Sequence, residues 1–323
     1  MKIAIMGFGI VGSGVAELLA NKQDHFKKMG NPITIAHILD LREFPDSPFA
    51  GVMTKSFEDI LNDPEVEVVA ELMGGVKPAY EYTKALLQSG KHVVSSNKEL
   101  VIKCGAELMQ VAADNGAGYM FEASVGGGVP IIRPLTTCLA ANEITGIVGI
   151  LNGTTNYILT QMAKNGETFE NALKSAQEKG YAEKDPTADV EGIDAARKIA
   201  ILASIATGRT VDSDSLPVKG ITAITPEDVK QAEASGCVIK LLGMCVKENG
   251  TVSISVQPVT LAKSHPLAGV DDVFNGIMVT GDAVGDVMFY GRGAGKSPTA
   301  SAVVADMIDI SKNKGSNFKV LWK

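Results

Sequence analysis

The sequence predicts an α/β protein in which a doubly wound parallel sheet is followed by a second, α+β domain. The 323 residues are enough for about two domains. Short apolar runs alternate with helical segments through the first part of the chain, which is typical of parallel βαβ units. After Pro134 the pattern changes to a mixture of hairpins and helices. We therefore expect a first domain over residues 1–130 and a second over 131–296, with a final helix at 297–313 that packs back on the first.

The composition excludes several classes of function. The chain has 30 basic and 37 acidic residues and a net charge of −7, so a nucleic-acid-binding surface is not expected. The four cysteines are scattered without a C-x-x-C pair, which indicates a reducing compartment and argues against a structural zinc site. The N-terminus lacks a signal-peptide pattern, and no run approaches the ~20 apolar residues of a membrane helix. We expect a cytoplasmic protein that binds neither nucleic acid nor membrane.

The first predicted strand, residues 2–6, leads into a glycine-rich turn and then a helix over residues 15–20. The turn is a G-x-G-x-x-G motif. Gly7 permits the tight turn, Gly9 lets the backbone approach a pyrophosphate, and Gly12 lets helix and strand pack closely. The pyrophosphate of a dinucleotide sits on the N-terminus of such a helix. This pattern predicts a Rossmann-type dinucleotide-binding domain, with cofactor-binding residues Gly7, Phe8, Gly9, Ile10, Val11 and Gly12.

The end of the second predicted strand, residues 33–39, carries two opposing signals about the cofactor. Asp40 follows the strand, and an acid at that point hydrogen-bonds the ribose 2′-hydroxyl of NAD. Arg42 lies two residues on and could pair with the 2′-phosphate of NADP, although a solvent-facing loop arginine explains it equally well. Both residues are candidate cofactor ligands, and the choice within NAD(P) stays open.

The next predicted strands place polar groups at the same edge of the sheet. A buried strand from residue 66 closes in a glycine turn that contains the cofactor candidates Met73 and Gly74, and a helix follows at 78–88. Residues 91–98 read as another strand, so Lys98 lies at its carboxyl end, where doubly wound sheets bind their ligands. A surface lysine is the alternative, but the predicted cofactor crevice favours a functional Lys98.

A helix to residue 115 is followed by a predicted strand at 119–123 and by three consecutive glycines at 126–128. Glu122 and the free carbonyl groups of this turn would suit a hard cation with oxygen ligands. On residue types alone, a flexible hinge between domains is the favoured interpretation.

The second predicted domain combines helices with hairpins. A strand at 143–151 ends in the polar turn Asn152-Gly153-Thr154-Thr155-Asn156, which could cap a helix that begins near Tyr157. The other predicted elements are helices at 169–178 and 226–235, a hairpin of 238–246 with 252–259 about an Asn-Gly turn, a hairpin of 277–281 with 283–290, and a final helix at 299–311.

Residues 180–198 bring charges to the edge of an apolar segment. Pro186 can open a helix after Asp185 as its N-cap. In that helix Asp194 and Lys198 are four residues apart and share a face. A solvated ion pair is the usual explanation for this spacing. The dinucleotide motif and Lys98 favour an active site instead, because a lysine ammonium can stabilise a developing alkoxide and give it a proton.

These motifs together resemble the homoserine dehydrogenase family. The resemblance runs through most of the chain, in the segments GFGIVGSG, ELMGG, SSNK, EASVGGGVPII, GILNGTTNYIL, GYAEKDPTADVEGIDAARK and GRGAGKSPTASAV. The segment at 180–198 is the most specific of them. The resemblance implies NAD(P)-dependent interconversion of L-homoserine and L-aspartate 4-semialdehyde, on the route to threonine, isoleucine and methionine.

Roles for individual residues are implied by the resemblance. Lys198 matches the acid/base, and Lys98 matches a lysine beside cofactor and substrate. A monovalent-cation site, usually sodium (Na+), is implied at the side chain of Glu122 and the carbonyl groups of Val125, Gly127 and Val129. The residues expected against the substrate are Glu183, Asp194, Asn152, Gly153 and Thr154. Those expected against the cofactor include Gly180 and Gly295.

The chain departs from the family pattern in places. SSNK stands where the family often has TANK, and the arginine that takes the 2′-phosphate is displaced to Arg42. The chain ends at Lys323, so a C-terminal ACT domain and threonine feedback through it are not expected. The family implies a homodimer through the second domain, with 277–290 as a candidate interface. Two alternatives remain: a non-catalytic NAD(P)-sensing protein, or a dehydrogenase for another amino-acid semialdehyde.

Overall fold

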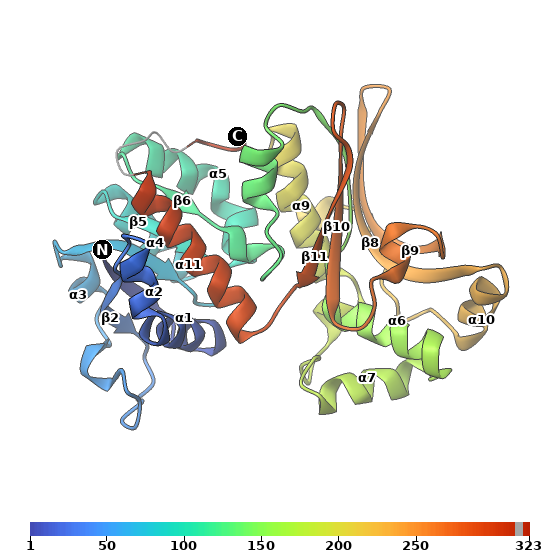
Figure 1. The fold of residues 1–323 in the computed structure, drawn as a ribbon, viewed down its shortest axis with the longest axis horizontal. Helices are drawn as coiled ribbons and strands as arrows, with labels where there is room; N and C mark the ends of the chain where they lie inside the picture. Colours follow the sequence, from blue (N-terminus) through green and yellow to red (C-terminus); the bar gives the residue numbers. More distant parts are fainter. Residues whose placement is uncertain (314–318) are drawn as a thin grey trace. The chain divides into compact units, whose positions relative to one another are not determined.

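The structure is a computed structural model that describes residues 1–313 and 319–323. It divides into two compact units (Figure 1). The first unit comprises Met1–Gly128, Gly208–Thr210 and Ala294–Lys323, and the second comprises Val129–Thr207 and Val211–Gly293. Within the described residues, no helix is both long and apolar enough to cross a membrane.

The first unit is built on a six-stranded parallel sheet, which confirms the predicted doubly wound architecture. The strand order is β3-β2-β1-β4-β5-β6, and the bounds are Lys2–Met6 (β1), Thr34–Leu39 (β2), Met53–Thr54 (β3), Val66–Glu71 (β4), His92–Ser95 (β5) and Tyr119–Met120 (β6). The central strand β1 pairs with β2 on one side and β4 on the other. Its residues Ile3 and Ile5 are fully buried, as expected for a strand covered on both faces.

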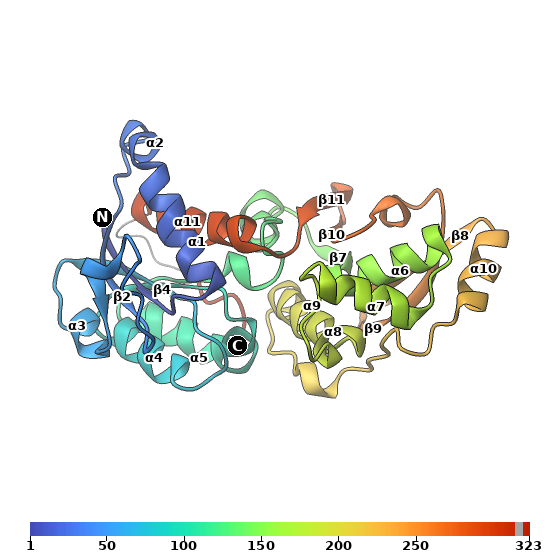
Figure 2. The ribbon, with the colours of Figure 1, turned by 90° about the horizontal axis from the view of Figure 1, so that it is seen from below.

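Helices cover the parallel sheet of the first unit. They are Ile10–Asn21 (α1), Gln23–Lys28 (α2), Phe57–Leu61 (α3), Ala79–Gln88 (α4), Lys98–Asp114 (α5) and Lys296–Lys312 (α11). The last helix, α11, packs against α1 (Figure 2). Gly14 permits this approach, because a Cβ at this position would lie 2.8 Å from Cγ of Lys296 and 3.0 Å from its carbonyl oxygen.

Two predicted strand ends in the first unit are wrong. The strand predicted at 119–123 stops at Met120, and Glu122–Ser124 form a 3-10 turn. The backbone N–H of Glu122 donates a hydrogen bond of 2.9 Å to the carboxylate of Asp306. This N–H therefore does not extend the hydrogen-bond ladder of the strand. The strand predicted at 91–98 covers only His92–Ser95, and Lys98 is the first residue of α5.

The second unit contains a five-stranded antiparallel sheet, which confirms an α+β second domain. The strand order is β11-β10-β7-β8-β9, and the bounds are Ile144–Ile150 (β7), Cys237–Glu248 (β8), Thr251–Ala262 (β9), Phe274–Gly281 (β10) and Gly285–Arg292 (β11). Both predicted hairpins are present. Asn249 and Gly250 join β8 to β9 with φ of 49° and 79°, the backbone that a two-residue type I′ turn requires.

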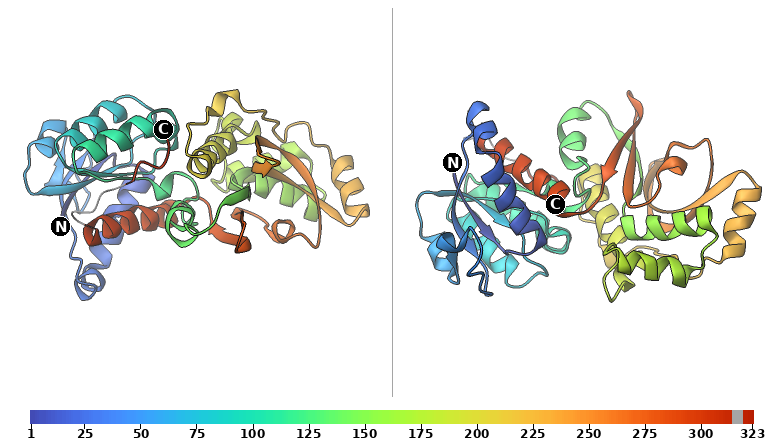
Figure 3. Two further views of the ribbon diagram at one scale, coloured as in Figure 1. Left: turned by 90° about the horizontal axis from the view of Figure 1, so that it is seen from above. Right: turned by 60° about the horizontal axis from the view of Figure 1, so that its bottom comes forward.

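The helices of the second unit lie beside this sheet (Figures 2 and 3). They are Gly153–Asn165 (α6), Phe169–Glu178 (α7), Thr187–Val190 (α8), Ile193–Thr207 (α9) and Pro226–Ala234 (α10). Helix α9 packs against β7, β8 and β9, and α6 packs against β8 and β10. Gly243 on β8 lets α9 come close, because a Cβ there would meet Cβ of Ile199 at 3.1 Å.

One predicted helix start and one predicted continuous helix in the second unit are wrong. Helix α6 begins at Gly153 rather than near Tyr157, because Asn152 caps it. The helix predicted to run from Pro186 through Lys198 is two helices, α8 and α9. Gly192 separates them with a φ of +83°, in the left-handed region that interrupts a helix.

The end of the chain is anchored in the first unit by Trp322, which is 1% exposed. Its ring packs edge-on against Phe121, with ring centroids 5.6 Å apart. A Cβ on Gly105 of α5 would lie only 2.8 Å from Cζ2 of Trp322, so the helix and the indole are in close contact.

Replacing Trp322 by alanine should lower the free energy of unfolding by about 3–5 kcal/mol, because it empties a filled site in the core. Trp322 is the only tryptophan of the chain, so unfolding in denaturant should be followed by circular dichroism. Trp322→Phe keeps an aromatic ring against Phe121 and should lose less. An alanine variant within about 0.5 kcal/mol of the parent would contradict this anchoring role.

Candidate active site

A buried ion pair lies near the start of α9 in the second unit. Nζ of Lys198 is 2.7 Å from Oδ2 of Asp194, one turn earlier, and the two side chains are only 11% and 8% exposed. The ammonium also donates a hydrogen bond of 2.9 Å to the carbonyl oxygen of Leu151, at the end of β7. The spacing seen in the sequence therefore gives a buried pair and not a solvated one.

Asn152 joins this pair to two other helices. Its Oδ1 accepts a hydrogen bond from the backbone N–H of Thr155 at 2.9 Å, which caps α6. Its Nδ2 donates to Oδ2 of Asp194 at 2.9 Å and to Oδ1 of Asp189 at 2.7 Å. One amide thus caps α6, contacts α8 and contacts α9.

Asp189 is a site residue that the sequence analysis missed. It lies half-buried on α8. Burial raises the pKa of Asp189, the nearby charge of Asp194 raises it further, and the hydrogen bond from Asn152 opposes both effects. Asp189 and Asp194 lie on different helices, so no helical spacing relates them. The only signal in the sequence is the density of acids around Gly192.

The first turn of α6 fits closely against a neighbouring loop. A Cβ on Gly153 would lie 2.7 Å from the carbonyl oxygen of Val273, so glycine is required there. Thr154 is 7% exposed and donates its hydroxyl to the carbonyl oxygen of Tyr181 at 2.8 Å. Gly153 and Thr154 therefore fix the first turn of α6 against the backbone of Val273 and Tyr181.

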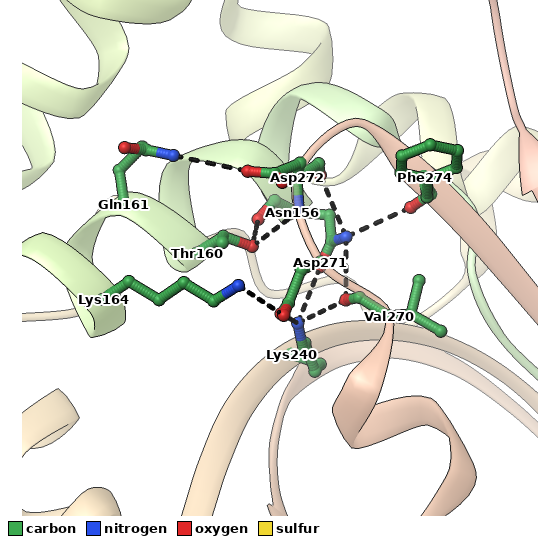
Figure 4. Close-up of polar contacts among 9 residues, drawn as sticks. All are labelled: Asn156, Thr160, Gln161, Lys164, Lys240, Val270, Asp271, Asp272 and Phe274. Atoms are coloured by element: carbon green, nitrogen blue, oxygen red, sulfur yellow. Dashed lines mark hydrogen bonds and ion pairs between the residues drawn. The ribbon is translucent and has the colours of Figure 1, made fainter.

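Helix α6 is anchored a turn further on by a second polar cluster (Figure 4). Nδ2 of Asn156 donates to the carbonyl oxygens of Val270, Asp272 and Phe274 at 3.0–3.1 Å. Nζ of Lys240, on β8, donates to Oδ1 of Asn156 at 3.2 Å and contacts Asp271 at 3.1 Å. Burial lowers the pKa of this lysine, and Asp271 opposes the change. These contacts fix the helix whose N-cap is Asn152.

Glu183 lies apart from these contacts in the second unit. Glu183 is exposed, and its backbone carbonyl oxygen accepts a hydrogen bond of 3.1 Å from the side-chain amide of Gln177. Among the residues that the structure describes, the Glu183 carboxylate makes no hydrogen bond or ion pair to Asp194 or Lys198. Gly180, which follows α7, has a φ of +73°.

The glycine-rich turn of the first unit has the geometry that its sequence requires. Gly7 has a φ of +96°, and a Cβ there would meet the carbonyl oxygen of Leu72 at 2.8 Å. A Cβ on Gly12 would lie 1.9 Å from the carbonyl oxygen of Gly7. Gly9, the N-cap of α1, has nothing within 4 Å of such a position. The N-terminus of α1 can therefore approach an anionic group through backbone N–H donors.

Asp40 and Arg42, the two opposing cofactor signals, are bound to each other. Nη2 and Nε of Arg42 donate to the two oxygens of Asp40 at 2.8 and 3.0 Å, and the N–H of Phe8 donates to the same carboxylate at 2.8 Å. The hydrogen bond from Arg42 is the main reason that the pKa of Asp40 falls to about 2. The Asp40 side chain is 9% exposed, whereas Arg42 is 63% exposed. The negative charge of Asp40 is therefore balanced by Arg42, and the guanidinium of Arg42 faces solvent.

Several other candidates of the first unit lie at helix starts or in turns. Lys98 is half-buried at the start of α5. Gly295 is the N-cap of α11, with a φ of +113°. Glu122 is 3% exposed, Val125 is buried, and Gly127 has a φ of +56°. No group of three or more His, Cys, Asp or Glu side chains that could hold a metal ion occurs in the described part of the chain.

Comparisons with known proteins agree with this architecture. Residues 7–122 match the model of the family described as homoserine dehydrogenase, NAD binding domain, and residues 130–308 match that described as homoserine dehydrogenase. A homoserine dehydrogenase of Bacillus subtilis is 44% identical over 97% of this chain and 73% of its own length. One of Synechocystis is 44% identical over 96% of this chain and 73% of its own. The chain thus spans about three quarters of these relatives.

Solved structures give the same result. A homoserine dehydrogenase from Thiobacillus denitrificans has a TM-score of 0.91 at 40% identity, covering 97% of this chain and 73% of its own. A hyperthermophilic archaeal homoserine dehydrogenase in complex with NADPH has a TM-score of 0.81 at 29% identity, covering 96% and 97%.

Asn152→Ser offers a test of the shared amide. Serine can still cap α6, but it cannot donate to Asp189 and Asp194. The pKa of Asp189 should then rise further. Because the amide stabilises the charged carboxylate, its loss costs stability only where the folded parent holds Asp189 in the charged form, so the gap in unfolding free energy from the parent should be small near pH 4. It should grow to about 1.5–3 kcal/mol as the pH rises through the folded-state pKa.

The matched control is Thr168→Ala, which removes the N-cap of α7, where Thr168 accepts from the N–H of Asn171 at 3.3 Å. Its cost, about 1 kcal/mol, should not depend on pH. Unfolding in urea between pH 4 and 8 measures both variants. A gap for Asn152→Ser that is the same at every pH would show that the amide does not stabilise the two carboxylates.

Proposed function

The chain belongs to the homoserine dehydrogenase family of NAD(P)-dependent oxidoreductases, and we propose that Lys198 is the acid/base of its reaction. This reaction interconverts L-homoserine and L-aspartate 4-semialdehyde. The nicotinamide cofactor supplies or accepts the hydride. The protein must then provide a group that gives a proton to the alkoxide in one direction and removes it in the other.

The single observation that supports Lys198 in this role is the state of its three N–H donors. Within the described structure the ammonium has two acceptors, a carboxylate oxygen of Asp194 and the carbonyl oxygen of Leu151. A lysine ammonium has three donors, so the third is left for the oxygen of a substrate. In a buried setting this donor stabilises a developing alkoxide more strongly than it would in water.

Asp189 and Asp194 suit the other end of the substrate. Homoserine carries an ammonium group, and two carboxylates share the amide of Asn152. We assign Asp194 to hold Lys198 and both acids to attract the substrate ammonium. The contribution of Glu183 remains a prediction from the sequence, as does the placement of Gly153 and Thr154 against substrate.

Lys98 is assigned the second positive charge of the reaction, and this assignment rests on its place in the first unit. It follows Asn97 directly, just after the carboxyl end of β5. That edge of a doubly wound sheet is where ligands bind. The cofactor pyrophosphate is assigned to the N-terminus of α1, while the roles of Met73, Gly74, Gly180 and Gly295 stay predictions.

The monovalent-cation site, expected to hold sodium at Glu122, Val125, Gly127 and Val129, stays a prediction from the sequence. The buried carboxylate and backbone carbonyls offer only hard oxygen ligands, which suit such an ion. When bound, the ion would supply positive charge that ties the turn together. The homodimer and the cytoplasmic location also stay predictions.

The acid/base assignment is tested with Lys198→Met. Oxidation of L-homoserine should be followed by cofactor absorbance, with NAD and NADP in parallel and other 4-carbon amino alcohols as substrate controls. The rate constant kcat should fall by roughly 10²–10⁴-fold, the usual contribution of general acid–base catalysis. Lys184→Met changes an exposed lysine of the same segment and should leave kcat unchanged. If Lys198→Met turns over like the parent, Lys198 is not the acid/base.

Cofactor choice should depend on Arg42. Its removal takes away an exposed guanidinium and frees the negative charge of Asp40, and both changes disfavour a 2′-phosphate. Arg42→Ala should therefore lower the ratio of kcat/KM for NADP over that for NAD by roughly ten- to a hundred-fold, whichever cofactor the parent prefers. Lys55→Ala, which breaks an exposed pair with Glu43, is the control. An unchanged ratio in Arg42→Ala would exclude this role.

A further inference from the structure

We propose that Glu71 is a positioning residue for the dehydrogenase reaction, which holds the turn after β4 and the start of α5 and thereby sets the position of Lys98. The proposal rests on the catalytic role assigned to Lys98 above. Glu71 is the last residue of β4 and is 0% exposed. No part of the assigned chemistry uses this carboxylate directly.

The carboxylate of Glu71 receives hydrogen bonds from two separate segments. Oε1 accepts the N–H of Met73 at 3.0 Å, from the turn that follows β4. Oε2 accepts the hydroxyl of Ser95 at 2.6 Å, from the end of β5. Nδ2 of Asn97 donates a longer hydrogen bond, of 3.4 Å, to Oε1 of Glu71. One side chain therefore joins two of the loops at the carboxyl edge of the sheet.

Asn97 connects Ser95 to the first turn of α5. Its N–H donates to Oγ of Ser95 at 3.0 Å, and its Oδ1 accepts the N–H of Leu100 at 3.1 Å, which caps the helix. Its Nδ2 also donates to the carbonyl oxygen of Gly75 at 2.6 Å. Asn97 is 7% exposed and Ser95 is 1% exposed, so these bonds are protected from water. Lys98 is the next residue, and its backbone is fixed by this chain of contacts.

The chemistry of the site favours a carboxylate over other residues of similar size. All three partners approach as donors, and an ionised carboxylate is an acceptor at both oxygens. A glutamine would turn an amide group toward donors, and a leucine would leave the Met73 N–H and the Ser95 hydroxyl without this acceptor. Burial raises the pKa of Glu71 to about 7, and these hydrogen bonds counteract the rise. An acid that costs free energy to bury is thus placed where it orders two loops.

The test combines Glu71→Gln with Lys98→Met in a double-mutant cycle on the full chain. The readouts are kcat and the cofactor KM for L-homoserine oxidation, with the unfolding free energy measured alongside. Glu71→Gln alone should lower kcat by roughly ten- to a hundred-fold, the cost of misplacing a catalytic group by about 1 Å. In the Lys98→Met background it should have little further effect, because the group it positions is gone. A merely structural role would give losses that add.

Glu67→Gln is the matched control, because it is the same substitution on the same strand at a partly exposed residue. It should leave kcat unchanged. If Glu71→Gln fails to fold, Ser95→Ala removes one of the donors with a smaller change and should show the same non-additivity with Lys98→Met. Additive losses, or no loss in Glu71→Gln, overturn the positioning role alone. Wild-type turnover in Lys98→Met overturns the role assigned to Lys98 and this proposal with it.

Discussion

The ion pair between Lys198 and Asp194 imposes the strongest constraint on the second unit. Taking two charges out of water costs several kcal/mol per ion, and their attraction offsets this only when further hydrogen bonds complete the site. Leu151 and Asn152 supply those bonds. Strand β7 must therefore end where α9 passes, and α6 must begin there. The ends of three elements are set by one pair of charges.

The first unit is subject to a different constraint, because an anionic dinucleotide must come close to the backbone of the glycine-rich turn. Parallel strands end at one edge, and Gly7 and Gly12 remove the side-chain atoms that would collide with neighbouring carbonyl oxygens. Two acids at this edge are paired or enclosed. Asp40 is paired with Arg42, and Glu71 is buried among donors. Neither of these two acids therefore presents an exposed, unpaired carboxylate.

Local patterns predicted the strands and helices well, because alternation and glycine turns depend on neighbours in the chain. The same patterns gave the Asp194–Lys198 pair. They could not give its burial, which depends on the end of β7. They also missed Asp189, because Gly192 breaks the helix and places this acid on α8, where the amide of Asn152 connects it to Asp194. Asp40 and Arg42 appeared as rivals in sequence, and only three-dimensional contact makes them a pair.

Lys198 and Glu71 are both buried and ionisable, yet the fold satisfies them to different degrees. Lys198 has three donors and two acceptors, so one donor can serve a ligand. Glu71 has both oxygens engaged by groups that belong to the protein. The unused donor lets Lys198 bind a ligand, whereas Glu71 acts in the proposal above by fixing the groups that donate to it. The hydrogen bonds around each buried charge therefore agree with the proposed roles, in which Lys198 serves the substrate and Glu71 positions its neighbours.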